Sequence, residues 1–155
     1  MAEILLDTGK VPFVLKFVDG DSETIYFNPT DFDLAEKIAK LPDIISEKTK
    51  EYKDVGLNLD GTPKNLEDIE DYTAMKKIVY DEIDNVFDFP VCEKVCKHCS
   101  MFAFVKGKMF FEQFLRAISP EIKKEIDKAR KEFDKEKAKR DKVNEHIGEY
   151  VNNDK

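Results

Sequence analysis

The chain has 155 residues, 38% of them charged and 41% apolar, and a formal net charge of −7. This length predicts one domain, large enough to bury a core without disulfides or metal. Residues 1–120 hold 15 basic and 23 acidic side chains, a net of −8, which argues against nucleic acid and anionic membranes as ligands because both need a basic surface.

The N-terminal third predicts a β-hairpin followed by a helix. Val11 to Val18 is rich in β-branched and aromatic residues, residues 19–22 supply turn chemistry, and Glu23 to Phe27 alternates again. Ile4 to Leu6 is a candidate third strand. A helix capped by Thr30 or Asp31 then follows, which Pro42 is expected to break or kink before a further helical segment ends near Tyr52.

A polar loop over residues 54–65, with two Gly and one Pro, separates this part from a second helical half. Residues 66–87 predict a long amphipathic helix with apolar residues spaced by three or four. These residues are Ile69, Tyr72, Met75, Val79, Ile83 and Val86. Pro90 ends that region, and residues 92–105 and 109–118 predict two shorter apolar helices.

Ser119 and Pro120 predict the start of a last, charged helix. Its apolar face follows a 4,3 heptad spacing, here called the seam. The seam consists of Ile122, Ile126, Ala129, Phe133, Glu136, Arg140, Val143, Ile147 and Tyr150. Glu136 and Arg140 are out of place in the core of a self-sufficient coiled coil. We therefore expect a projecting helix whose residues beyond about Asp134 add little to the stability of the isolated chain.

Three cysteines, Cys92, Cys96 and Cys99, have the C-x3-C-x2-C spacing of some iron–sulfur sites, with His98 beside them. Within the helix predicted over 92–105, however, all three thiols share one face and His98 points to the side, so a fourth ligand is lacking. Buried small apolar residues are the favoured interpretation, and metal binding or redox function are the alternatives. An odd number of closely spaced thiols, without a signal peptide or a transmembrane stretch, predicts a reducing cytoplasm.

Three stretches of the chain carry a family resemblance. They are residues 83–87 (IDNVF), residues 111–122 (FEQFLRAISPEI), preceded by the polar Gly break at 105–108, and the strand, Asn-Pro, helix entry at 25–31. Together they resemble tail assembly chaperones of long-tailed phages and prophages of Gram-positive bacteria, over roughly residues 11–125. The chain departs from that pattern after Phe87, where Asp88-Phe89-Pro90 replaces a Gly-rich turn.

The predicted fold is α+β and mostly α. An N-terminal hairpin packs on a bundle built from residues 31–52, 66–87, 92–105 and 109–118, which makes residues 1–120 one globular domain and 120–155 a projecting charged helix and tail. The resemblance implies a non-enzymatic protein without a cofactor, acting in the host cytoplasm. It would bind the helical tape measure protein and help recruit tail tube subunits.

Partner binding is expected on the apolar and basic side chains of the C-terminal half, by a helix-in-groove mode. The expected residues are Phe102, Phe104, Phe110, Phe111, Phe114, Leu115, Lys124, Lys128 and Lys131. Two alternatives stay open: a structural tail or connector component of the virion, and a small metal-binding protein that uses the three cysteines.

Overall fold

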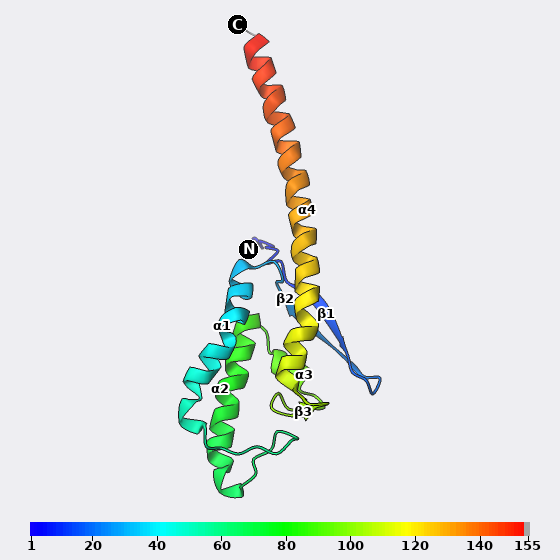
Figure 1. Ribbon diagram of the computed structural model, residues 1–155. Helices are drawn as coiled ribbons and strands as arrows, with labels where there is room; N and C mark the ends of the chain where they lie inside the picture. Colours follow the sequence, from blue (N-terminus) through cyan, green and yellow to red (C-terminus); the bar gives the residue numbers. More distant parts are fainter. Residues whose placement is uncertain (154–155) are drawn as a thin grey trace.

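The computed structural model describes the backbone of residues 1–153 and the side chains of residues 1–148. It is mostly helical, with an N-terminal antiparallel β-hairpin and a long C-terminal helix, which confirms the predicted fold class. Figure 1 shows a body built from the hairpin and the shorter helices, from which the C-terminal helix projects.

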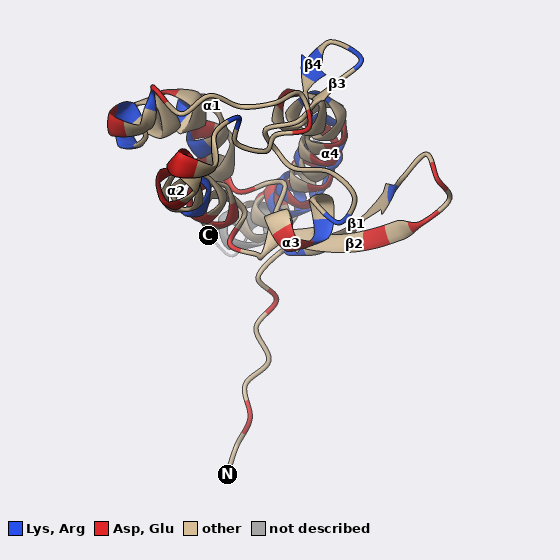
Figure 2. Ribbon diagram, turned by 90° about the horizontal axis from the view of Figure 1, so that it is seen from below, with Lys and Arg blue, Asp and Glu red and all other residues tan. Residues whose placement is uncertain are grey.

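The hairpin consists of β1 (Val11–Lys16) and β2 (Ser22–Phe27), as predicted. Its buried face is aromatic, since the rings of Phe13 and Phe27 stack with centroids 4.3 Å apart. Ile4 to Leu6 do not form the third strand that we expected. The side chain of Asn28, just after β2, donates to the carbonyl of Thr8, just before β1 (3.1 Å). The residues before Thr8 extend away from the body (Figure 2).

Helix α1 (Phe32–Lys48) begins at the predicted cap, because Asp31 Oδ1 accepts from the backbone N–H of Asp33 at 3.0 Å. Of the break or kink that we expected at Pro42, the break is absent, since Pro42 lies inside the helix. Leu41 and Ile45, on either side, both pack on the core, and this burial outweighs the backbone hydrogen bond that proline removes. A short 3-10 helix, η1 (Lys50–Tyr52), follows.

The predicted long amphipathic helix is present as α2 (Ile69–Phe87), entered through the short 3-10 helix η2 (Leu66–Asp68). It packs along α1 and ends at Asp88, which adopts the left-handed conformation (φ 50°) and donates its N–H to the carbonyl of Asn85. Its predicted apolar face lies against the core. Val79, Ile83 and Val86 are buried.

The prediction of a helix over residues 92–105 is wrong beyond its first turn. Helix α3 (Val91–Val95) ends after five residues, and a small hairpin of β3 (Phe104–Val105) and β4 (Lys108–Met109) follows. Distant backbone groups replace the helical hydrogen bonds here, since the Phe104 N–H donates to the Leu59 carbonyl at 2.7 Å. The hydrogen bond to the 54–65 loop thus stabilises a non-helical conformation of the segment after α3.

Residues 109–118 and the charged C-terminal segment form one helix, α4 (Phe110–Asn153), and not the two that we expected. Ser119 does not cap a new helix. Its hydroxyl donates to the Leu115 carbonyl one turn earlier (2.7 Å), and Pro120 is accommodated inside the helix. Ile118 and Ile122 are both buried against the body, so packing on both sides of Pro120 keeps the axis continuous.

Helix α4 leaves the body one to two turns beyond the predicted boundary at residue 120. Ile126 still packs against the core, whereas every residue from 130 to 148 is exposed. The projecting part is the orange and red end of the ribbon in Figure 1. The seam residue Tyr150 has a side chain outside the described ones.

Candidate functional site

A groove with a volume of about 890 Å³ lies between β1 and the first turns of α4. The strand and the turn after it contribute residues 12–19 to its wall. The helix contributes side chains spaced by three or four positions, namely Phe110, Gln113, Phe114, Ala117, Ile118, Glu121 and Glu125. A mostly apolar hollow between a strand and a helix is suited to a segment of another protein.

The strand wall of the groove follows from the alternation in β1. Phe13 and Leu15 pack against the core, whereas Val14 on the other face is exposed (61% relative area), as is Val18 in the turn after the strand (109%). The exposed valines were absent from our predicted binding residues. Their signal is visible in the sequence, because both faces of this strand are apolar while a hairpin on the surface normally keeps one face polar.

Beside the groove, the edge of β1 carries no strand among the described residues. The Phe17 N–H donates to the Asp21 carbonyl (2.9 Å), so Phe17 and, by alternation, Phe13 and Leu15 direct their backbone groups toward β2. Pro12, Val14 and Lys16 then direct theirs to the open edge. Pro12 has no N–H to leave unpaired there, which fits an edge position.

The rim of the groove is charged. Lys16 and Asp19 stand on the strand side, and Glu121 and Glu125 stand on the helix side. Glu121 pairs with Lys124 at 3.1 Å, and Glu125 lies 4.0 Å from Lys128. These exposed pairs exchange easily with a partner's charges, since surface ion pairs contribute little to stability.

The predicted binding residues divide into three groups by position. Phe102 and Phe114 are core residues, 8% and 6% exposed, although the edge of Phe114 reaches the groove. Phe110 also lines the groove, while Phe111 and Leu115 line a second hollow of about 660 Å³ between α4 and α1.

The remaining predicted residues are all exposed. Phe104 lies on the small hairpin, 47% exposed, and Lys124, Lys128 and Lys131 lie on α4 but do not line the groove. The structure therefore brings Phe110 and Phe114 together with a strand wall that we did not predict, and it places the three lysines farther along the same helix.

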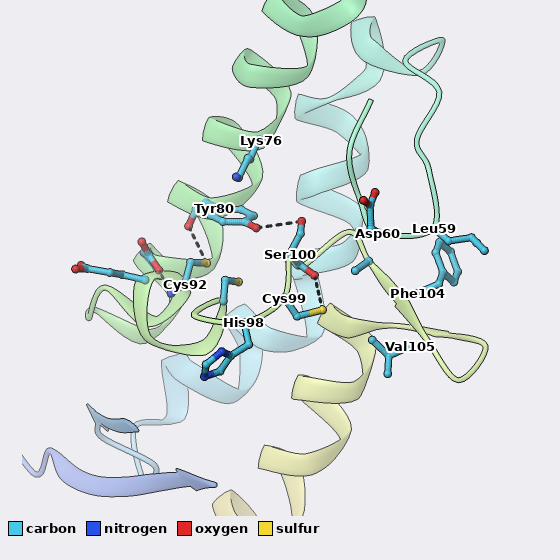
Figure 3. A pocket seen from close by; sticks show the side chains of 14 residues that line it. Leu59, Asp60, Lys76, Tyr80, Cys92, His98, Cys99, Ser100, Phe104 and Val105 are labelled. Atoms are coloured by element: carbon cyan, nitrogen blue, oxygen red, sulfur yellow. Dashed lines mark hydrogen bonds between the residues drawn. The ribbon is translucent and has the colours of Figure 1, made fainter. Parts of the chain in front are cut away.

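Cys92, Cys96 and Cys99 line a different hollow, of about 750 Å³, between α2, α3 and the 54–65 loop. Tyr80 is its central polar group (Figure 3): its hydroxyl accepts the Met101 N–H (3.1 Å) and lies 3.3 Å from Ser100 Oγ. Burial raises the pKa of Tyr80 to about 12, so the phenol stays protonated and can donate to Ser100. This network fastens the segment after α3 onto α2.

The three thiols do not share one helix face, contrary to our expectation. Cys92 is buried within α3, Cys96 is the residue at which that helix ends, and Cys99 lies in the following turn. The hydrogen bond between Cys92 and Cys96 raises the pKa of Cys92 and lowers that of Cys96. Among the described residues, no group of three or more His, Cys, Asp or Glu side chains is arranged to hold a metal ion.

His98 is turned from the thiols toward the hairpin (Figure 3), where its Nε2 lies 3.1 Å from Asp21 Oδ2. Lys97 Nζ lies 2.8 Å from the same carboxylate and 3.2 Å from Glu23. The hydrogen bonds from Lys97 and His98 lower the pKa of Asp21 to about 2. The charged groups after α3 thus hold the end of the β1–β2 hairpin beside the groove.

Comparison with family models, with curated proteins and with solved structures found no match to this chain. Among the described residues, no helix combines the length and the apolar character needed to span a membrane.

Proposed function

We propose that this chain is a non-enzymatic assembly chaperone of long-tailed phage or prophage tails, which holds the tape measure protein while tail tube subunits are recruited. The family resemblance supplies the biological role. The observation that supports a holding function is the open apolar groove between β1 and α4.

The α4 side of the groove has the residue spacing that receives an amphipathic helix. Phe110, Phe114 and Ala117 recur at one side of α4 with the three- and four-residue spacing that interdigitates with a second helix. A helical tape measure segment would place its apolar residues there. Where such a segment continues along α4, Lys124, Lys128 and Lys131 would face its acidic side chains.

The groove can be blocked without touching the core, because Ala117 lines it and is exposed. Co-expression with the cognate tape measure protein should raise the soluble yield of that protein, and Ala117→Arg should remove the gain. Ala138→Arg is the matched control, since Ala138 is exposed on the projecting part of the same helix and outside both the groove and the seam.

Charge reversal of Lys124, Lys128 and Lys131 to Glu should weaken capture without unfolding the chain, because all three side chains are exposed. Capture that survives both Ala117→Arg and the triple reversal would remove this groove from the proposal. Turnover of a small substrate by the purified chain would replace the proposal with an enzyme.

The two alternatives have separate tests. A virion component would remain at fixed copy number in purified mature particles, whereas a chaperone would be absent from them. A metal protein would carry about one zinc or iron per chain and would lose it together with its fold on chelation.

A further inference from the structure

The projecting part of α4 exposes a face that is apolar except at Glu136 and Arg140. Phe133, Val143 and Ile147 are 60%, 57% and 56% exposed, and Ala129 begins this face where the helix leaves the body. The stretch from 130 to 153 would extend about 36 Å at the rise of an α-helix. A helix of this length is marginal in water unless its apolar face is buried, and every side chain from 130 to 148 is exposed, so the seam indicates a partner.

We propose that the partner is a second copy of this chain, and that two α4 helices associate antiparallel about a two-fold axis at the level of Ala138. In that arrangement each seam residue meets the residue that lies equally far on the other side of Ala138. Phe133 then faces Val143 of the other copy, and Ala129 faces Ile147.

The two charged seam residues select this arrangement. Glu136 lies two positions before Ala138 and Arg140 two positions after it, so each Glu136 meets an Arg140 of the other copy in two central layers. A parallel pair in register would instead place Glu136 against Glu136 and Arg140 against Arg140. Like charges in the seam would oppose that pairing.

The same residues also set the register. Sliding one antiparallel helix by a heptad in one direction would place Glu136 against Ile147 and Arg140 against Val143. Sliding it in the other direction would place Glu136 against Phe133 and Arg140 against Ala129. Both shifts leave charges unpaired against apolar residues, which is costly, whereas a polar layer that is satisfied in one register is a known device for specifying it.

The flanks and the bodies are compatible with this pairing. Lys139 lies 3.6 Å from Glu136 of its own chain and, like Lys137, can direct its ammonium group to solvent along a flexible stem. With the axis at Ala138, residues 129–147 of one copy lie opposite residues 147–129 of the other. Each body therefore sits at an opposite end of the paired helices, outside the exposed stretch of its partner.

A charge-swap series on the full-length chain tests the proposal by sedimentation equilibrium. The wild type should be a dimer. Glu136→Arg and Arg140→Glu, each alone, should raise the dimer dissociation constant by about a hundredfold, because each creates like-charged central layers. The double variant Glu136→Arg/Arg140→Glu should restore dimerisation. Lys142→Glu, an exposed change off the seam, is the control and should leave the dimer intact.

The double variant separates the possible arrangements, since a parallel dimer would still hold like charges opposite each other and would stay weakened. At about 0.1 mM, a dimer with a micromolar dissociation constant is almost fully formed. A wild-type chain that is monomeric at this concentration would overturn the proposal. So would a dimer that neither single variant weakens, or a double variant that fails to recover. Circular dichroism at matched concentration keeps loss of folding distinguishable from loss of association.

Discussion

Helices α2 and α4 carry similar apolar patterns and meet different surroundings. In α2, Val79 and Ile83 are at most 5% exposed, because α1, α3 and the hairpin pack around that helix. In the second half of α4, Val143 and Ile147 are more than 55% exposed, because no other part of the chain that the structure describes covers them. Periodicity therefore identifies which face of a helix is apolar, and only the tertiary arrangement decides whether that face belongs to the core or remains available to another molecule.

The largest contrast is expected between equivalent truncations in the two helices. Ile83→Ala should lower the free energy of unfolding by about 3–4 kcal/mol, since it removes buried methyl groups and leaves a cavity. Ile147→Ala should change it by less than about 0.5 kcal/mol at a concentration where the chain is monomeric. Urea denaturation measures both, and similar losses would show that the projecting helix is buried in the isolated chain.

The 54–65 loop should be nearly as sensitive as the core where it meets the segment after α3. Gly61 has φ +86°, and a Cβ there would lie 2.9 Å from Ser100 Oγ and 3.0 Å from the Ala103 nitrogen. Gly61→Ala should cost about 2–3 kcal/mol through backbone strain and displacement of these neighbours. Gly20→Ala is the control, since φ is +97° there with open space around the new methyl group. If thermal unfolding shows equal losses of stability for Gly61→Ala and Gly20→Ala, backbone strain alone accounts for both, and the contacts with Ser100 and Ala103 contribute nothing.

The tyrosine network should contribute less. Tyr80→Phe leaves the Met101 N–H without its acceptor and should cost about 1–2 kcal/mol. Tyr26→Phe, on an exposed side chain, should be close to neutral. Denaturant unfolding compares the two. In a spectrophotometric titration, the wild type should show one phenol ionising near pH 12 that the Tyr80→Phe variant lacks.

Removal of the projecting helix should leave the stability of the monomer nearly unchanged and should abolish association. A chain that ends after Lys135 keeps all of the buried core residues, so its unfolding midpoint at dilute concentration should be nearly that of the full chain. Because the truncation removes the central charged layers, the proposed dimer should be lost in sedimentation. A drop of several degrees in the midpoint would place part of the projecting helix in the monomer's core.

The smallest expected effect is a pH dependence at the charged contact that holds the hairpin. Asp21 has a pKa lowered from 3.8 to about 2 by Lys97, His98 and the Ser22 N–H, so the folded state favours the ionised carboxylate. Its contribution is present above about pH 4 and is lost as the pH falls to about 2. The unfolding curves of the wild type and Asp21→Asn should therefore converge over that interval, and a constant difference would exclude this linkage.

The hairpin, α1's cap and α2 could be predicted from the sequence because their determinants are local. Alternating residues around a turn specify β1 and β2, Asp31 bonds to a backbone N–H two residues away, and α2 repeats its apolar residues over nineteen positions. The seam of α4 could also be predicted, because its 4,3 spacing is local. Glu136 and Arg140 were expected to be out of place in a coiled-coil core, whereas the proposed antiparallel dimer pairs them with each other.

The segment after α3 and the groove depended on tertiary structure. Residues 96–109 have the composition of an apolar helix, yet their backbone groups bond to Leu59 and to the Tyr80 side chain, partners that lie tens of positions away in the chain. Pro42 was expected to break or kink a helix and Pro120 to begin one, whereas each lies within a single helix, α1 or α4, with buried residues on both sides. Local pattern determines which conformations a segment favours. The choice among them falls to contacts with distant residues, because the free energy of burying a side chain exceeds that of a single lost backbone hydrogen bond.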